Sequence, residues 1–276
     1  MTVPSPFRGA MRLPAIAAPM FLVSGPALVI EACKAGVAGT FPALNARTPE
    51  QLDGWLAEID AALSAARAAD PSALVAPYGI NLILHPSNPR VAPDLALIGQ
   101  HEVPFVITSL GHPGAVVQAV HAYGGLVFSD VIHADHARKA IAAGVDGIVA
   151  VASDAGGHAG TQSAFSLVRE IREFWDGTLI LGGAISDGYA VWAAEVLGAD
   201  FAYLGTRFIA TRESSAPEAY KQMLVDATAK DIVYTDAVSG TNANFLWPSL
   251  EKVGYRREEL VQGVGKGKLE SLAEEA

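Results

Sequence analysis

The middle of the chain reads Gly147-Ile148-Val149-Ala150-Val151 and, two residues later, Asp154-Ala155-Gly156-Gly157-His158-Ala159-Gly160. The first run is continuously apolar, as is typical of a strand that is buried on both faces of a parallel sheet. The glycines of the second run permit positive φ angles and a close approach of the backbone to a flat ligand, and an imidazole exchanges protons near neutral pH. We therefore expect a parallel strand whose end presents His158 to a ligand; a turn whose histidine only bonds a carbonyl is the alternative.

Short apolar runs of this kind recur along the chain. The strand candidates are residues 15–17, 37–40, 78–82, 105–108, 126–129, 148–151, 179–181 and 201–204. Helical patterns lie between them, for example over Pro49–Ala69 and over Gly188–Leu197, which Gly198 ends. Eight strands with helical crossovers predict an α/β protein, a (β/α)8 TIM barrel over residues 1–212. A doubly wound open sheet is the alternative, but its glycine fingerprint after the first strand is missing.

The remaining residues, 213–276, are expected to form a C-terminal helical and loop appendage that packs on the barrel. A helix is predicted over residues 216–229, followed by a polar segment over 231–248 and a charged tail. Within that segment, residues 239–245 read Ser-Gly-Thr-Asn-Ala-Asn-Phe and could fold back to cover the active site. An ordinary polar connector is the alternative.

Composition limits the partners and the location of the protein. The 276 residues are 51% hydrophobic and carry a formal net charge of −10, which argues against binding to nucleic acid or to an anionic membrane. The single cysteine, Cys33, cannot form an internal disulfide, and the N-terminal residues lack the apolar core of a secretion signal. No apolar run is long enough to cross a bilayer. We expect a cytoplasmic protein that binds small molecules; whether it forms a homo-oligomer stays open.

Two glycine turns point to a phosphate site. In a TIM barrel the active site lies at the C-terminal ends of the strands, and the loops after the seventh and eighth strands commonly hold phosphate. Gly182 and Gly183 follow the seventh strand, and Gly205 and Thr206 follow the eighth. Their main-chain NH groups and the threonine hydroxyl are suited to a phosphate, and the adjacent Arg207 adds positive charge.

Other strand ends offer contacts for a flat ring. After the first strand, Ala18, Pro19 and Met20 supply backbone and one polarisable side chain, which suit an aromatic ring better than proton transfer. Asn81, at the end of the third strand, can donate to and accept from the edge of a heterocycle, although a buried asparagine can also serve neighbouring backbone.

Histidines raise the alternative of a metal hydrolase. His85, His112 and His158 are predicted on one face of the barrel, and His133 and His136 have ligand spacing on a helix. Metal-dependent barrel hydrolases usually begin with paired histidines at the first strand, where this chain has no hard ligand. We therefore expect no metal, and place His133 and His136 at the start of the helix after the fifth strand.

With these motifs in order, the chain resembles the nitronate monooxygenase family of FMN-dependent barrel enzymes, once called 2-nitropropane dioxygenases. The resemblance covers nearly the whole barrel and is carried by residues 17–20, 80–82, 140–147, 155–160, 182–188, 197–200 and 205–211. It implies FMN as cofactor, with its phosphate at Gly182, Gly183, Gly205 and Thr206 and its ring near Ala18, Pro19, Met20 and Asn81. Asp130 and Gly157 complete the implied cofactor site, and His158 is the implied catalytic residue.

One departure from the family concerns charge beside the ring. Relatives often carry a lysine at the end of the fifth strand and a glutamine after the sixth, where this chain has Asp130 and Ala150 or Val151. An ionised Asp130 would oppose negative charge on reduced flavin, which a lysine would favour.

The resemblance also implies a reaction. Alkyl nitronates would be oxidised with O2 to carbonyl compounds and nitrite, with His158 orienting the nitronate or removing the α-proton of a neutral nitroalkane. The alternatives on the same scaffold are an NAD(P)H:quinone reductase and an FMN-type enoyl reductase. A vestigial FMN-binding barrel without activity is the alternative outside enzymes.

Overall fold

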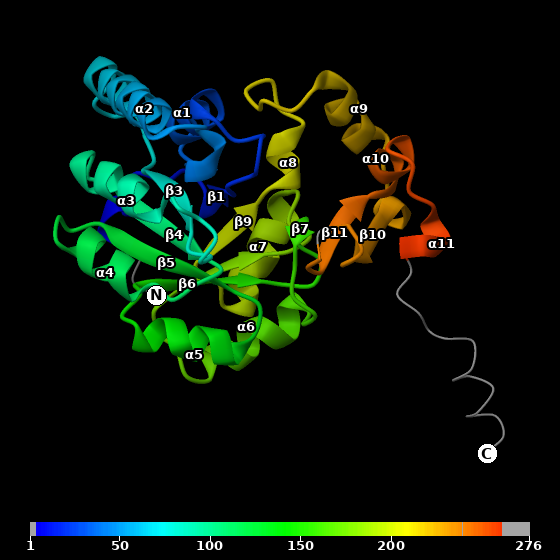
Figure 1. The fold of residues 1–276 in the computed structure, drawn as a ribbon. Coiled ribbons are helices and arrows are strands. Elements are labelled where there is room, and N and C mark those ends of the chain that lie inside the picture. Colours follow the sequence, from blue (N-terminus) through cyan, green and yellow to red (C-terminus); the bar gives the residue numbers. More distant parts are fainter. Residues whose placement is uncertain (1–3, 239, 261–276) are drawn as a thin grey trace.

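Eight parallel strands close into a barrel in the order β1-β2-β3-β4-β5-β6-β8-β9, with β9 pairing back onto β1 (Figure 1). The computed structural model describes residues 4–238 and 240–260; Ser239 and the tail predicted beyond residue 260 lie outside the described residues. The barrel strands are β1 (Ala15–Ala17), β2 (Ala38–Pro42), β3 (Tyr78–Ile83), β4 (Phe105–Ser109), β5 (Leu126–Val131), β6 (Gly147–Val151), β8 (Thr178–Gly182) and β9 (Phe201–Leu204). The predicted TIM barrel is thus confirmed, and each strand end lies within two residues of its predicted position.

Helices follow the strands on the outside of the barrel. They are α1 (Pro26–Lys34), α2 (Pro49–Ala69), α3 (Val91–Gln100), α4 (Gly114–His121), α5 (Ala134–Ala142), α6 (Ala164–Arg172), α7 (Gly188–Leu197) and α8 (Thr206–Ile209). Short 3-10 turns occur as η1 (Ser5–Phe7) and η2 (Ala43–Asn45). No helix in the described part of the chain combines the length and the apolar character needed to cross a membrane.

Local sequence explains the clearest helices. The Thr48 side chain accepts a hydrogen bond from the Gln51 amide at 3.2 Å, which satisfies one of the free NH groups at the start of α2. Helix α7 starts at an Asp187 cap and ends at Gly198, whose φ of 114° is accessible to glycine at little cost. Both helices have the bounds that the sequence predicts.

Aromatic side chains fill the interior of the barrel toward the N-terminal ends of its strands. Phe7, from η1, plugs the N-terminal end of the barrel, with ring centroids 5.1 Å from Phe105, 6.0 Å from Phe128 and 4.9 Å from Phe201. Phe105 and Phe201 are the first residues of β4 and β9, and all four rings are at most 2% exposed. Because this end is packed with aromatic side chains, a ligand of the barrel is expected at the opposite, C-terminal end, where this fold places its active sites.

The C-terminal appendage contains a small sheet that the sequence does not predict. The elements of the appendage are α9 (Glu218–Asp226), η3 (Ala229–Asp231), β10 (Ile232–Thr235), β11 (Ala243–Leu246), α10 (Trp247–Lys252) and α11 (Arg257–Leu260). The helix predicted over 216–229 is therefore shorter, because it starts after Pro217 and ends where Ala227 is extended. The predicted polar segment over 231–248 contains the strands β10 and β11, and β11 also pairs with β7 (Gly157–His158), a strand outside the barrel (Figure 1).

Candidate active site at the C-terminal mouth of the barrel

Three polar side chains form a hydrogen-bonded row near the C-terminal end of the barrel. The Asn81 side-chain amide donates to Ser109 Oγ at 2.7 Å, and the Ser109 hydroxyl donates to Asp130 Oδ2 at 2.5 Å. These residues lie near the ends of the neighbouring strands β3, β4 and β5. Side chains alternate across a strand, so Ser109 and Asp130 share the inward face with Ile107 and Phe128. Asn81 and Asp130, both predicted site residues, are thus brought together by Ser109, which the sequence analysis missed.

Two polar atoms in this layer lack partners. Oδ1 of Asp130 and the hydroxyl of Tyr203, in β9, are buried without a hydrogen-bond partner among the described residues. Burial raises the pKa of Asp130 to about 6, against the opposing effect of the Ser109 hydrogen bond. Burial and the neighbouring Asp130 also raise the pKa of Tyr203 well above its usual range. Because unpaired buried polar atoms are costly, this layer is chemically suited to receive polar atoms of a ligand.

The loops after β8 and β9 bring backbone close to neighbouring loops. Gly183 has a φ of 147°, and a Cβ atom there would lie 2.9 Å from both Ala152 Cβ and Asp154 Oδ1. The next amide, of Ala184, donates to the Asp154 carbonyl at 3.1 Å. A side chain at position 183 is therefore excluded by conformation and by space, in the half-buried turn where the sequence predicts a phosphate site.

The His158 loop lies against the same region. A Cβ atom at Gly156 would lie 2.9 Å from Thr206 Oγ1, and a Cβ atom at Gly205 would lie 3.6 Å from Met20 Sδ. Gly157 has a φ of 74°, and His158 is exposed. The structure thus places the predicted histidine loop, the β9–α8 turn and the loop after β1 at one end of the barrel, as the sequence analysis expects.

Asn45 holds the loop after β1. Its side-chain amide donates to the carbonyls of Met20 at 2.9 Å and Ser24 at 2.8 Å, and its Oδ1 accepts from the Leu22 amide at 2.9 Å. Leu22 has a positive φ of 62°, a conformation that needs such support. The sequence gives no sign of this role, because Asn45 lies on η2, distant along the chain from the predicted ring contacts.

The other histidines make local contacts. His133 caps α5 by accepting from the His136 amide, and the two rings lie 3.6 Å apart between centroids, as predicted for the start of that helix. His85 Nδ1 lies 2.7 Å from Ser87 Oγ, and His112 Nδ1 accepts from the Gly114 amide at 3.2 Å. Among the residues that the structure describes, no group of three or more His, Cys, Asp or Glu is placed to hold a metal ion.

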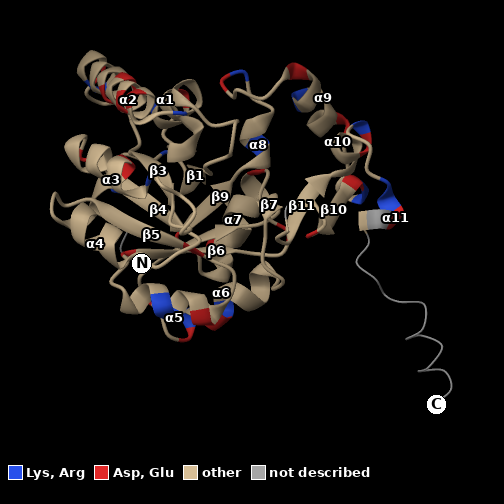
Figure 2. Ribbon diagram, in the orientation of Figure 1, with Lys and Arg blue, Asp and Glu red and all other residues tan. Residues whose placement is uncertain are grey.

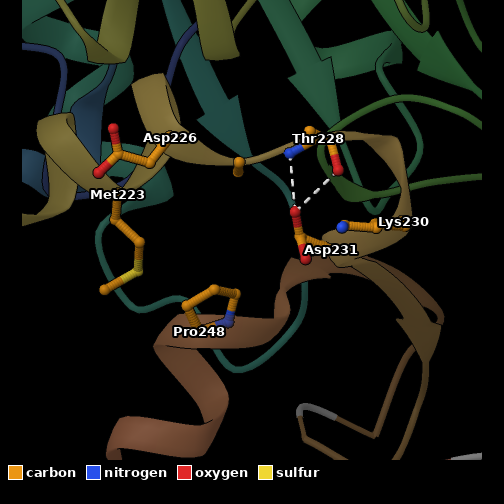
Figure 3. Close-up of a pocket in the computed structure, with 7 residues that line it drawn as sticks. Met223, Asp226, Thr228, Lys230, Asp231 and Pro248 are labelled. Carbon is orange, nitrogen blue, oxygen red and sulfur yellow. Dashed lines mark hydrogen bonds between the residues drawn. The ribbon is translucent and has the colours of Figure 1, made fainter.

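A surface hollow lies in the appendage, away from these residues. Figure 3 shows its lining by Met223, Asp226, Thr228, Lys230, Asp231 and Pro248. Its carboxylates already serve the local structure: Asp231 accepts from the Thr228 amide at 2.8 Å, and Asp226 accepts from the Gln222 side chain at 2.8 Å. The hollow contains no residue of the predicted site.

Positive charge is distributed over separate elements rather than concentrated in one band. Lys and Arg residues lie on α5, α9 and α11, among others (Figure 2). That the protein does not bind nucleic acid stays a prediction from the sequence.

Comparison with known proteins identifies the class of enzyme. The family model for nitronate monooxygenase matches residues 9–254. A nitronate monooxygenase from Neurospora crassa is 30% identical over 263 residues, 84% of this chain and 70% of that one. A protein from Mycobacterium tuberculosis named as a monooxygenase is 33% identical over 165 residues, 59% of this chain, and the match spans only 44% of the relative. The chain is an oxidoreductase of a flavin-dependent class. It belongs to the nitronate monooxygenase family.

Solved structures with this fold carry two different names. FabK from Thermotoga maritima superposes with a TM-score of 0.77 at 26% identity, covering 94% of this chain and 80% of that one. The nitroalkane oxidase of Streptomyces ansochromogenes superposes with a TM-score of 0.76 at 26% identity, covering 88% and 79%. The two likenesses are nearly equal, so they define the fold and the family rather than the substrate.

Proposed function

We propose that the protein is an FMN-dependent monooxygenase that oxidises alkyl nitronates with O2 to carbonyl compounds and nitrite. In this proposal Gly182, Gly183, Gly205 and Thr206 hold the FMN phosphate. The ring lies beside Ala18, Pro19, Met20, Asn81 and Asp130, with Gly157 at its edge. When bound, FMN supplies the electron transfer from substrate and the reaction with O2.

The observation that carries this proposal is the contact between the histidine loop and the second phosphate turn. A Cβ atom at Gly156 would lie only 2.9 Å from Thr206 Oγ1, so the histidine loop packs against this turn. This contact supports a role for His158 beside the proposed cofactor site. The partnerless Asp130 Oδ1 and Tyr203 hydroxyl lie in the inward layer of the same barrel end and fit a ligand with polar edges. The glycine turns suit a phosphate because Gly182, Gly183 and Gly205 add no side chain of their own between the main-chain NH groups and the ligand.

The residues of the chain have distinct tasks in this reaction. His158, exposed at the mouth, would orient an anionic nitronate by donating a hydrogen bond, or would take the α-proton of a neutral nitroalkane at an imidazole nitrogen. Asp130 would set the charge beside the ring, and Ser109 would hold the orientation of its carboxyl group. The packed aromatic plug around Phe7 would keep water out of the other end of the barrel.

The test is anaerobic bleaching of the flavin by a preformed alkyl nitronate and by NAD(P)H, compared side by side. The purified protein is expected to be yellow, to release FMN rather than FAD on denaturation, and to bleach with the nitronate. Failure of added FMN to give a bound-flavin spectrum or to raise the melting temperature would contradict the cofactor assignment.

The likeness to FabK favours a second candidate, a flavin-dependent reductase of the quinone or enoyl type. That function predicts fast bleaching by NAD(P)H and slow bleaching by the nitronate. A barrel that binds FMN but is bleached by neither would be the inactive alternative. The cytoplasmic location, the oligomeric state and the division into residues 1–212 and 213–276 stay predictions from the sequence.

A further inference from the structure

The side chain of Asn244, on β11, binds the loop that precedes His158. Its Nδ2 donates to the carbonyl of Ser153 at 2.8 Å and to the carbonyl of Ala155 at 2.8 Å. Both carbonyls lie between the end of β6 and β7, about ninety residues earlier in the chain. One amide from the appendage therefore uses both of its N–H groups on the proposed catalytic loop.

The backbone of the loop also pairs with β11 at His158 itself. In the antiparallel pair of β11 and β7, Ala243 lies opposite His158 and Asn244 opposite Gly157. The Ala159 amide donates to the Asn242 carbonyl at 3.3 Å, and the Tyr234 hydroxyl, on β10, donates to the Gly160 carbonyl at 3.0 Å. The appendage thus binds the loop on both sides of the histidine.

Apart from the Ser153 amide, which donates to the Gln162 carbonyl at 2.8 Å and closes the base of the loop, few contacts hold its tip. Gly156, Gly157 and His158 are all exposed, and the two glycines have the largest conformational freedom of any residue type. On the barrel side, the Asp154 carbonyl accepts from Ala184, which ties the start of the loop to the β8 turn. Residues 156–158 have no buried side chain, so hydrogen bonds from β10 and β11, together with the contact of Gly156 with Thr206, restrict this segment.

We propose that Asn244 is a positioning residue for His158, and that the β10–β11 ribbon is a clamp on the catalytic loop. This inference rests on the proposed role of His158. Asn244 need not contact substrate: it acts by holding the Ser153 and Ala155 carbonyls, and so the path of the backbone into His158. A misplacement of a catalytic group by about 1 Å can lower the rate by about 10²-fold.

The first measurement is hydrogen exchange of the loop in the FMN-loaded protein. Asn244→Ala is expected to increase exchange across residues 153–160, to retain FMN, and to lower kcat for a preformed nitronate by about 10²-fold with little change in KM. Asn88→Ala is the matched control, because Asn88 Nδ2 donates to the Ile83 carbonyl at 2.7 Å in another loop at the same end of the barrel. It removes the same kind of bond and is expected to leave exchange at residues 153–160 and kcat unchanged.

A second variant keeps the size of the side chain and changes only its hydrogen bonding. Asn244→Asp replaces the donor by acceptors that repel the two carbonyls, and it regains one O–H donor when the carboxyl is protonated. Its kcat relative to wild type, measured at each pH, is therefore expected to rise as the pH is lowered.

A double-variant cycle separates positioning from general stability. If Asn244 acts through His158, Asn244→Ala should lower kcat in the wild-type background and have no further effect on kcat in the His158→Ala background. An additive loss in the double variant, or wild-type exchange at residues 153–160 in Asn244→Ala, would overturn the inference. Failure of the proposed function is distinguishable, because it appears in the wild type as a flavin that the nitronate does not bleach.

Discussion

The hydroxyl of Ser109 donates a 2.5 Å hydrogen bond to Oδ2 of Asp130, and the other oxygen of this carboxyl group is buried without a partner among the described residues. Half of the group is thus satisfied by the protein and half is available to a ligand. Burial, opposed by the serine, raises the Asp130 pKa to about 6. The charge at this point in the barrel consequently changes within the physiological range of pH.

The flavin potential should depend on the charge of Asp130. Below about pH 6 the carboxyl is protonated and neutral; above it, the negative charge disfavours the reduced flavin. Asp130→Asn is expected to make the flavin easier to reduce above this pH, and to have little effect below it. Unit charges roughly 10 Å apart interact by about 2 kcal/mol at an effective dielectric constant of about 20. Redox titrations of both proteins over this pH range would measure the difference.

Ser109→Ala supplies the control for this prediction. The Ser109 hydrogen bond lowers the Asp130 pKa, so its removal should move the onset of the pH dependence upward. Equal potentials for wild type and Asp130→Asn at alkaline pH would place Asp130 away from the ring.

A side chain at position 183 should weaken FMN binding. Gly183→Ala combines an unfavourable φ of 147° with contacts of 2.9 Å, and Gly183→Val adds further bulk. Strain of about 1–3 kcal/mol would lower FMN affinity by roughly 5- to 150-fold if the loop moves away from the phosphate. Gly54→Ala is the matched control, since Gly54 lies within α2 with no atom near its Cβ position, and the change should stabilise the protein without altering FMN affinity. Unchanged FMN affinity in Gly183→Ala, measured by fluorescence titration, would move the phosphate site elsewhere.

His158→Ala should retain FMN and fold but lose turnover. Loss of a positioned acid or base typically lowers the rate by about 10² to 10⁴. A neutral nitroalkane needs a base to remove its α-proton, whereas a preformed nitronate needs only a hydrogen-bond donor that orients it. Oxygen consumption with a nitroalkane and with its preformed nitronate separates these roles. Wild-type rates with both substrates would mean that His158 has only a structural role in its turn.

His101 should make stability depend on pH at a place far from the mouth. Burial lowers its pKa, but hydrogen bonds and charges from Asp53, at 2.8 Å, and Asp60, at 3.0 Å, outweigh this and raise it overall. The stabilisation is fully present below the unfolded pKa of about 6.5 and is lost as the pH rises through the raised folded value. His101→Gln should therefore lower the free energy of unfolding by about 1 kcal/mol in mild acid and by less in alkali. Urea unfolding at both pH values checks this, and a constant difference would contradict it.

Local patterns in the sequence determined the barrel. Continuous apolar runs predict buried parallel strands, and the spacing of Leu52, Leu56, Ile59 and Leu63 predicts α2, whose inner face they form. The Asp187 cap and Gly198 define α7 in the same way. These features depend on residues within a few positions of one another, so a single chain contains the information to predict them. The predicted end of the barrel for the site follows from the fold class alone.

Contacts between distant segments were decided only by the tertiary structure. The pairing of β7 with β11 joins residues more than eighty positions apart, and the polar segment around Asn244 has no periodicity that predicts a strand partner. Likewise, Ser109 meets Asn81 and Asp130 only because the register of three strands aligns their ends. Such contacts form only when the whole barrel folds and brings distant groups together. Helix caps and apolar spacing, by contrast, act within one segment, so they can be predicted from the local sequence.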